Sequence, residues 1–298
     1  MKKLCLLIGL CFLSLEASVS VGDLLEKEHD LQIREDVRAQ WMEFPDGRLY
    51  RRRRGFDFFS IIDEQDPIYP RQVIFPIDTT EEDLSCCIIT YASNNRNREG
   101  DAEKKILRMK ASLEKVGFKG HLLYRIGGWP NMEEGCLAHC HVPYGFKVCA
   151  FLEALRLGYK KAIWLDVSII ALKPLDSLFQ WIQEKNCLYR FAYNPLDRYA
   201  HDLFLQAMNI SLEELSDIPH ISACVVGLNL EDQNVRNFLQ AWHQSVLEED
   251  AYFSFYPEQL PMSVLMKRYG LTQGIYSDPF VKMKEEEIEK CCFYNLKR

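Results

Sequence analysis

The stretch that decides the fold is PYGFKVCAFLEALRLGYKKAIWLDVSIIALKPLDSLF, which spans Pro143–Phe179. Its first part, Tyr144–Leu157, has the apolar spacing of an amphipathic helix, and Gly158 follows directly. A glycine after such a segment is typical of a helix end. The second part, Ala162–Leu172, is a strongly apolar run that favours a strand. This stretch therefore predicts a helix followed by a strand.

The same alternation continues on both sides of this stretch. Upstream, Leu84–Tyr91 is a continuous apolar run typical of a strand buried on both faces, Ala102–Val116 has helical spacing, and HLLYRI at 121–126 favours a second strand. Further segments downstream predict a strand over Ile221–Leu230 and helices over Asp232–Leu247 and Glu258–Tyr269. Alternation of this kind predicts an α/β fold with a mostly parallel central sheet flanked by helices.

The chain is expected to have three regions: a signal peptide over residues 1–20, an N-terminal extension over 21–80 and the main α/β domain over 81–298. In the first region, Lys2 and Lys3 precede an apolar stretch, Leu4–Leu15, and small residues follow from Ala17. The apolar stretch is about half of the ~20 residues that a membrane-spanning helix needs. Cleavage near Ala17–Ser20 and a place in the secretory pathway are therefore expected, with a retained signal anchor as the alternative.

The N-terminal extension mixes charged clusters with prolines, and a rough apolar stripe predicts a short helix over Asp23–Trp41. Its basic run, Arg51–Arg54, is either a solvated loop or a contact for a membrane surface or an anionic partner. The formal net charge of the whole chain is -7. A general nucleic-acid binder needs an excess of lysine and arginine, so nucleic acid is not an expected partner.

Cysteines are frequent. Two of the eleven, Cys5 and Cys11, lie in the signal segment, which leaves nine in the remainder. In an oxidising compartment some of these should form disulfides, and the odd number leaves at least one thiol outside an internal pair. Cys149, Cys187 and Cys224 lie in apolar contexts that are equally typical of buried free thiols.

The candidate site follows from the position of Asp166. In open α/β sheets, ligands bind beyond the carboxyl ends of the strands, where the strand order reverses. Asp166 and Ser168 lie in the predicted strand Ala162–Leu172, at the place where such a site is expected. The alternative is that Asp166 only caps a turn.

This part of the chain resembles the core of the GT-A nucleotide-sugar transferases, in which a helix and a Gly-Tyr turn precede a strand with the motif W-L-D-x-D or W-L-D-x-S. Here the motif reads Trp164-Leu165-Asp166-Val167-Ser168. Two further stretches, HISACVVGLN at 220–229 and YPEQ at 256–259 followed by SVL at 263–265, are similar to segments of the same family. The resemblance covers roughly Leu84–Gly274 and implies a GT-A fold and glycosyltransferase activity.

The resemblance also implies a divalent metal. In these enzymes the carboxylates of the aspartate motif hold Mn²⁺ or Mg²⁺ against the diphosphate, and the ion neutralises the leaving group. Asp166 and Ser168 are therefore the expected metal site. Ser168 replaces the second carboxylate, so the pair loses one charge. A site that ligates through the Ser168 hydroxyl or a water, and a site with weak or no metal binding, are both open.

Other donor contacts are implied by position. The end of the first strand usually meets the base and ribose in this family, which indicates Tyr91, Ala92 and Ser93. The small-residue segment that contains Gly227 and Asn229 is expected to lie under the donor sugar.

Three cations are candidates for the donor phosphates: Lys147 in the predicted helix, and Arg96 and Arg98 after the first strand. Taken singly, each of these residue types is more often a solvated surface residue than a phosphate contact. Trp129, in the long loop 127–143, offers a flat face for a base or a sugar, or an ordinary hydrophobic anchor.

Glu258 and Gln259 begin the last predicted helix. A carboxylate at this place indicates acceptor orientation or, in an inverting enzyme, a general base. An acid in a first helical turn is also explained by the helix dipole alone.

Two functions are therefore weighed. The first is a glycosyltransferase that moves a sugar from a nucleotide-sugar donor to a glycan or glycoprotein acceptor. The second is a catalytically inactive secreted module of the same fold that binds a glycan or protein partner, which the missing second carboxylate and the signal peptide favour. The sequence contains no G-x-S-x-G elbow, H-E-x-x-H motif or P-loop that would indicate another chemistry.

Overall fold

The computed structural model describes residues 32–35, 40–43, 49–52, 71–77, 83–92, 101–126, 142, 144–192, 195–248, 250–254, 256–274, 281–282 and 291–296. The expected signal peptide lies outside these ranges, as do Ser93, Arg96, Arg98 and Trp129. In chain order the strands and α-helices are β1 (Gln32–Glu35), β2 (Gln40–Glu43), β3 (Leu49–Arg52), β4 (Arg71–Ile77), β5 (Cys86–Ala92), α2 (Asp101–Lys115), β6 (Gly120–Ile126), α3 (Phe146–Arg156), β7 (Lys161–Leu165), β8 (Ile169–Ala171), α4 (Asp176–Lys185), β9 (Cys187–Phe191), α5 (Asp202–Met208), α6 (Leu212–Ser216), β10 (Ile221–Asn229), α7 (Gln233–Leu247), α8 (Gln259–Arg268), β11 (Val281–Lys282) and β12 (Phe293–Asn295).

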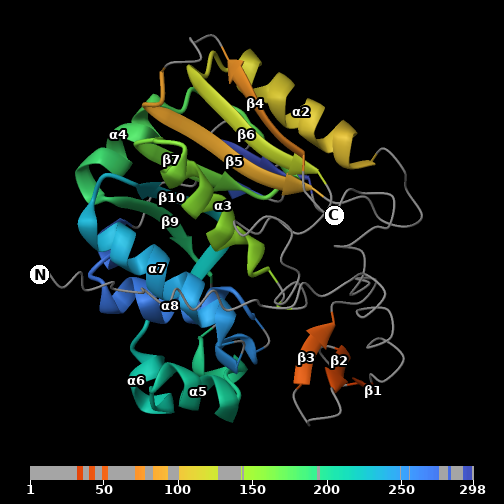
Figure 1. The fold of residues 1–298 in the computed structure, drawn as a ribbon, viewed down its shortest axis with the longest axis vertical. Helices are drawn as coiled ribbons and strands as arrows, with labels where there is room; N and C mark the ends of the chain where they lie inside the picture. Colours follow the sequence, from red (N-terminus) through yellow and green to blue (C-terminus); the bar gives the residue numbers. More distant parts are fainter. Residues whose placement is uncertain are drawn as a thin grey trace, which may run out of the picture.

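A six-stranded sheet in the order β4-β6-β5-β7-β10-β9 forms the centre of the molecule (Figure 1). β5 pairs in parallel with both β6 and β7. β4 and β10 run against their neighbours, so β6, β5, β7 and β9 all point in one direction. The predicted α/β fold, with a mostly parallel central sheet flanked by helices, is confirmed.

Helices cover both faces of this sheet. Alternate residues of β5 belong to two separate clusters, because successive side chains on a strand point to opposite faces. Cys87 and Ile89 pack with residues of α3, α7 and α8, whereas Cys86 and Ile88 pack with residues of α2 and α4. A strand covered on both sides reads as a continuous apolar run, which is why the sequence identified it.

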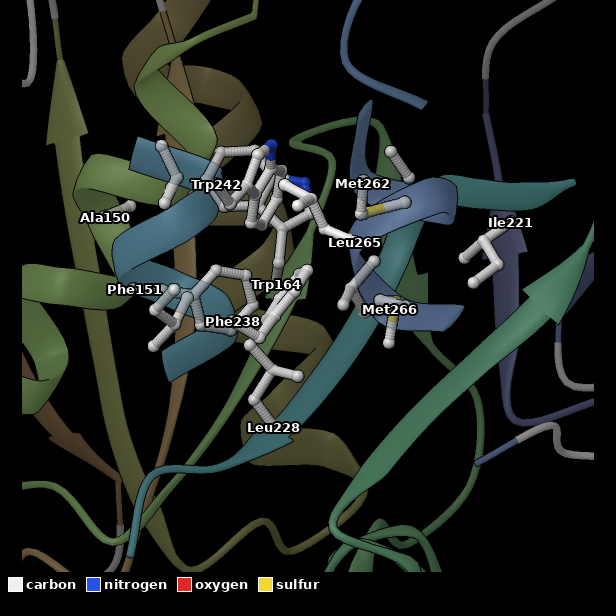
Figure 2. Packing of buried hydrophobic residues seen from close by; sticks show 14 of the residues in the cluster. Ala150, Phe151, Trp164, Ile221, Leu228, Phe238, Trp242, Met262, Leu265 and Met266 are labelled. Carbon is white, nitrogen blue, oxygen red and sulfur yellow. The ribbon is translucent and has the colours of Figure 1, made fainter. Parts of the chain in front are cut away.

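The first of these clusters combines large aromatic side chains with aliphatic and methionine side chains (Figure 2). Phe151 of α3 lies 6.3 Å from Trp242 of α7 between ring centroids, and Phe238 lies 5.4 Å from Trp242. Trp164 of β7 belongs to the same cluster and is 2% exposed. Burial of each large side chain stabilises the fold by about 1.5–3 kcal/mol. The strand that leads to the candidate site is thus anchored in a buried cluster through Trp164.

The expected β-helix-β unit is present, since β5 and β6 flank α2 and pair in parallel. Its helix and α3 end as expected, before glycines at positive φ: +68° at Gly117 and +91° at Gly158. Glycine adopts this left-handed conformation without a steric penalty, so it ends a helix readily. No α-helix within the described ranges combines the length and apolar character that crossing a bilayer requires.

The predicted strand Ala162–Leu172 is two strands. β7 ends at Leu165, the chain turns where the Ile169 N–H donates to the Asp166 carbonyl (2.8 Å), and β8 joins a separate three-stranded sheet in the order β11-β12-β8. An apolar run does not reveal such a turn, because both strands are buried.

The N-terminal extension also differs from the sequence expectation. The helix expected over Asp23–Trp41 is wrong at 32–35 and 40–41, where β1 and β2 form a small antiparallel sheet with β3. A short irregular apolar pattern does not distinguish a helix from a strand. Here the backbone pairing of β2 with β1 and β3 makes these segments strands. β4 lies in the same expected region and pairs with β6 along its length, so residues 71–77 supply the edge strand of the central sheet.

Candidate functional site

The candidate site lies where the strand order of the central sheet reverses. From β5 the chain passes to β6 on one side and later returns to β7 on the other side. The carboxyl ends of β5 and β7 therefore lie together, and the Thr90 hydroxyl donates to the Leu165 carbonyl across them (2.7 Å). Asp166 follows β7 directly. Open α/β sheets bind ligands at such a reversal.

Asp166 is held from several sides. Its backbone N–H donates to the Cys224 carbonyl (3.0 Å), which extends the ladder between β7 and β10. Its Oδ1 accepts from Trp164 Nε1 (3.0 Å) and from Lys147 Nζ (3.2 Å). Trp164 reaches it because residues two apart on a strand share a face. With 17% of its side chain exposed, Asp166 is fixed in place and only partly accessible to solvent.

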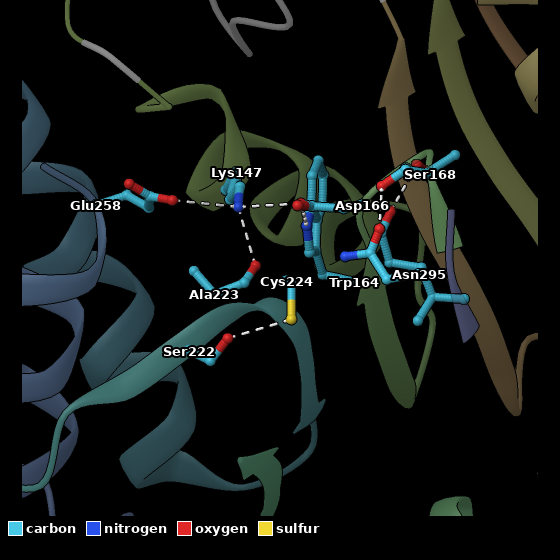
Figure 3. A network of polar contacts seen from close by, with 11 residues as sticks. Lys147, Trp164, Asp166, Ser168, Ser222, Ala223, Cys224, Glu258 and Asn295 are labelled. Carbon is cyan, nitrogen blue, oxygen red and sulfur yellow. Dashed lines mark hydrogen bonds and ion pairs between the residues drawn. The ribbon is translucent and has the colours of Figure 1, made fainter. Parts of the chain in front are cut away.

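Lys147, in the first turn of α3, lies between two carboxylates (Figure 3). Its Nζ lies 3.2 Å from Asp166 Oδ1, 3.5 Å from Glu258 Oε1 and 2.9 Å from the Ala223 carbonyl oxygen. An ammonium has three N–H donors, and these three acceptors match them. We call Lys147, Asp166 and Glu258 the Lys147 triad.

The Lys147 triad is poorly hydrated. The side chains of Lys147 and Glu258 are 4% and 7% exposed. Lys147 Nζ also lies 5.4 Å from the ring centroids of both Tyr144 and Trp164, at the distance of a cation–π contact. Two carboxylates and one ammonium leave the triad with one net negative charge.

The pKa of Lys147 reflects these neighbours. Burial alone lowers the pKa, but the charges of Asp166 and then Glu258 outweigh burial and raise it above its ordinary value of 10.5. An opposite charge within a few ångströms favours the charged form of a group. Lys147 is therefore an ammonium at neutral pH.

Glu258 and Gln259 contact different partners. Glu258 is the N-cap residue of α8 and turns its carboxylate to Lys147. Gln259 Oε1 lies 2.8 Å from His220 Nε2, and the His220 ring lies 5.0 Å from that of Tyr256. Of the two residues, only Glu258 is tied to Asp166 through the triad.

Ser168 faces away from the triad. Its side chain is buried, its hydroxyl donates to Asn295 Oδ1 (3.0 Å), and its carbonyl accepts from the Leu296 N–H (2.9 Å). Figure 3 shows Asp166 and Ser168 turned to separate groups of partners. The turn after β7 thus separates the two residues that the motif would use as one metal site.

These residues do not fit Mn²⁺ or Mg²⁺. Both ions need several oxygen ligands around one point. Asp166 Oδ1 instead faces an ammonium, and the Ser168 hydroxyl faces Asn295. Across the residues that the structure describes, no three side chains of histidine, cysteine, aspartate or glutamate are grouped to hold a metal.

The structure brings five of the expected site residues together at the carboxyl ends of β5 and β7. Tyr91 and Ala92 end β5, beside the end of β7, and the Tyr91 ring lies 4.6 Å from that of Phe146. The five residues at these strand ends are Tyr91, Ala92, Lys147, Asp166 and Glu258.

Gly227 and Asn229 are not brought to Asp166. Gly227 lies mid-strand, and a Cβ there would come within 2.5 Å of Ile182 Cδ1. Asn229 pairs with Lys161 at the beginning of β7, about 13 Å along the strand from its other end. Gly227 therefore lies in the interior of the sheet, and Asn229 lies at the opposite end of the strands from Asp166.

Sequence reasoning missed three contributors to the site: Trp164, Tyr144 and the carbonyl of Ala223. The spacing of Trp164 and Asp166 was a usable signal, since it places both on one face of the strand. Tyr144 adopts a positive φ of 63° just before α3, and the pattern of apolar and polar side chains does not predict this backbone conformation. Every residue has a backbone carbonyl, so the sequence does not indicate that the carbonyl of Ala223 contributes to the site.

Several cysteines are buried thiols rather than disulfides. Cys86, Cys87, Cys187 and Cys224 are free, and burial raises the pKa of each. The expectation of buried free thiols is met at Cys187 and at the partly buried Cys224. Disulfides elsewhere in the chain stay a prediction.

No known protein-family model matches the sequence, and neither does any curated protein. Similar solved structures include the galactosyltransferase LgtC in complex with donor and acceptor sugar analogues, at 11% identity over 70% of this chain and 86% of that chain, with a TM-score of 0.39. Mouse xyloside xylosyltransferase 1 is 12% identical over 74% of this chain and 88% of its own, with a TM-score of 0.39. A glycosyltransferase involved in glycosylation of the major capsid of PBCV-1 is 12% identical over 71% and 92%, with a TM-score of 0.42. Identities and scores this low assign neither an activity nor a substrate to this chain.

Proposed function

We propose that the protein is a glycosyltransferase that moves a sugar from a nucleotide-sugar donor to a glycan or glycoprotein acceptor. The observation that carries the proposal is the place of the Asp166 carboxylate, directly after β7 and beside the end of β5, where the strand order reverses. Nucleotides bind at this place in open α/β sheets. The W-L-D-x-S motif that surrounds Asp166 supports the same assignment.

The exposure of the site residues suggests their roles. Asp166 is the most exposed member of the Lys147 triad, so the donor would meet this carboxylate first. Tyr91 and Ala92, at the adjoining strand end, would border the base and ribose. Glu258 is buried against Lys147 and would act through it as a positioning residue, in place of the general-base role considered from sequence.

The diphosphate of the donor needs positive charge from outside the triad, because the triad is itself net negative. Arg96 and Arg98 follow β5 in the sequence and are the cations proposed for this task. They lie outside the described residues, as does Trp129, whose proposed role is to stack on the base or the sugar.

A thermal-shift screen against UDP- and GDP-sugars, with and without Mn²⁺, tests the proposal. A ligand that binds only the native state stabilises it by about 2.7 kcal/mol at 100 times its Kd. We expect at least one nucleotide sugar to raise the Tm of the wild type and to lose this effect in Asp166→Asn. Asp217→Asn changes an exposed carboxylate elsewhere and should respond like the wild type. If no nucleotide sugar raises the Tm, the proposal is wrong.

A catalytically inactive module of the same architecture is the second candidate. The closed contacts of the site favour it: Lys147 has a protein acceptor for each of its N–H donors, and Ser168 is held by Asn295. Such a module would bind a glycan or a protein through another surface. Binding to a glycan panel that Asp166→Asn leaves intact, without any response to nucleotide sugars, would select this function.

The secretory pathway is the proposed location, on the strength of the N-terminal segment of residues 1–20. Mass spectrometry of protein recovered from its native source should find a new N-terminus near Ala17–Ser20. A mature chain that still begins at Met1 would contradict cleavage and favour a retained anchor.

A further inference from the structure

Two carboxylates from distant parts of the chain face one point. Asp166 follows β7, and Glu258 caps α8, yet both direct an oxygen at the same nitrogen, Lys147 Nζ. A backbone carbonyl, that of Ala223, completes the set of oxygen acceptors around it. Carboxylate and carbonyl oxygens are the ligands that hard cations prefer. The ammonium therefore occupies the position in which these oxygens would share a cation.

We propose that the Lys147 ammonium takes the place of a divalent cation at the Asp166 site, so that donor binding here requires neither Mn²⁺ nor Mg²⁺. The identity of the donor rests on the proposed function. The exclusion of the metal depends on the Lys147 triad and Ser168 and not on the donor.

Charge is the first reason for this exclusion. A divalent ion on the Asp166 carboxylate would lie only a few ångströms from the Lys147 ammonium. The two positive charges would repel strongly, because the site is poorly hydrated and screens charge weakly. The attraction that remains is also small, since the ammonium already offsets one of the two carboxylates.

Ligand supply is the second reason. The motif residue that would assist Asp166, Ser168, is buried and donates its hydroxyl proton to Asn295. Glu258 is turned to Lys147 and is 7% exposed. An entering ion would have to displace Lys147 from between the carboxylates before it could use either of them.

Lys147 is well suited to this place. Its side chain is 4% exposed, and the rings of Tyr144 and Trp164 lie 5.4 Å from its Nζ. Because it is covalently part of α3, this cation cannot dissociate as a metal ion would. It holds Asp166 in one orientation together with the indole N–H of Trp164.

Direct measurement of Mn²⁺ binding tests the proposal without reference to activity. Electron paramagnetic resonance titration counts bound Mn²⁺ in the wild type and in Asp166→Asn, with no donor present. We expect no difference between the two proteins. Bound Mn²⁺ in the wild type that Asp166→Asn removes would overturn the proposal.

A variant that should gain Mn²⁺ binding provides a second test of the proposal. Lys147→Ala removes the ammonium and leaves room between Asp166 and Glu258. We expect this variant to bind Mn²⁺ at least about tenfold more tightly than the wild type, and the added change Glu258→Gln to remove the gain. Lys110→Ala, at the exposed face of α2, is the control and should gain nothing. A folded Lys147→Ala protein without the gain would also overturn the proposal; if this variant does not fold, the wild-type titration still decides.

The donor screen separates this proposal from the proposed function. A nucleotide sugar that raises the Tm equally in EDTA and in Mn²⁺ supports both. Failure of every nucleotide sugar, together with no Mn²⁺ at Asp166, refutes the proposed function and supports the exclusion of the metal. Donor binding that appears only with Mn²⁺ overturns the exclusion.

Discussion

Replacement of Lys147 by methionine should destabilise the protein by about 3 kcal/mol at neutral pH. Methionine nearly preserves the length and apolar stem of lysine, so the change removes a charge and its three hydrogen-bond donors rather than opening a large cavity. It leaves the carboxylates of Asp166 and Glu258 facing each other with no cation between them.

The magnitude follows from burial. Loss of one partner of a buried ion pair typically costs about 3–5 kcal/mol, because the remaining charge is left uncompensated. Glu258 is 7% exposed and bears this cost fully, whereas Asp166 is 17% exposed and is partly relieved by water. The lower end of the range, about 3 kcal/mol, is therefore expected. This corresponds to a decrease in Tm of about 5 °C in a chain of 298 residues, because the entropy of unfolding is about 2.1 cal/mol/K per residue.

The pH dependence of this stability loss shows whether the uncompensated carboxylates cause it. In Lys147→Met the native state should take up a proton on one of the facing carboxylates as the pH falls, while the solvated carboxylates of the unfolded chain take up fewer. Stability increases toward lower pH wherever the native state binds more protons, so the loss should decrease between about pH 7.5 and pH 5. In the wild type, the raised pKa of Lys147 means that its contribution is complete at neutral pH and is lost only above its ordinary value of 10.5.

Urea unfolding of the wild type and Lys147→Met, at both pH values, measures these effects. Lys110→Met is the matched control, since Lys110 forms an exposed ion pair with Glu114 one helical turn away. Surface pairs of this kind contribute about 0.3–0.5 kcal/mol. If Lys147→Met loses no more stability than Lys110→Met, or if its loss is the same at both pH values, the account of the triad as a buried ion cluster is wrong.

Three further predictions concern neighbouring features. Gly227→Ala would place a Cβ 2.5 Å from Ile182 Cδ1, and the overpacking should lower the free energy of unfolding by about 1–3 kcal/mol in urea titrations; an unchanged midpoint would contradict the close contact. Burial raises the pKa of Cys187 to about 12 from 9.0, so its alkylation by iodoacetamide near pH 8 should be roughly 1000-fold slower in the native than in the unfolded protein, as peptide mass spectrometry would show. Equal rates would mean that the thiol is open to solvent. Trp164→Phe removes the N–H that donates to Asp166 and should cost about 1.5–3 kcal/mol and weaken any donor-dependent rise in Tm; donor binding of wild-type strength would show that the indole does not position the carboxylate.

Local patterns determined much of the fold in advance. The apolar runs at Leu84–Tyr91 and Ile221–Leu230 became β5 and β10, and the spacing at Ala102–Val116 became α2. These elements are recognisable because strands covered on both faces and amphipathic helices each impose their own period on neighbouring residues. Elements with weaker signals, such as β4 and β9, were found only in the structure.

The sequence by itself placed Asp166 in a buried strand of an open α/β sheet, in the kind of fold that binds ligands at its strand ends, because apolar periodicity is enough for that. Only the tertiary structure decided what surrounds it. Lys147 and Glu258 lie 111 positions apart, and Ser168 and Asn295 lie 127 apart. No periodic pattern spans such distances, because these pairs are set by how α3 and α8 pack against the central sheet and by how β12 pairs with β8 in the smaller sheet. Packing thus gave Asp166 an ammonium as its neighbour and turned Ser168 away.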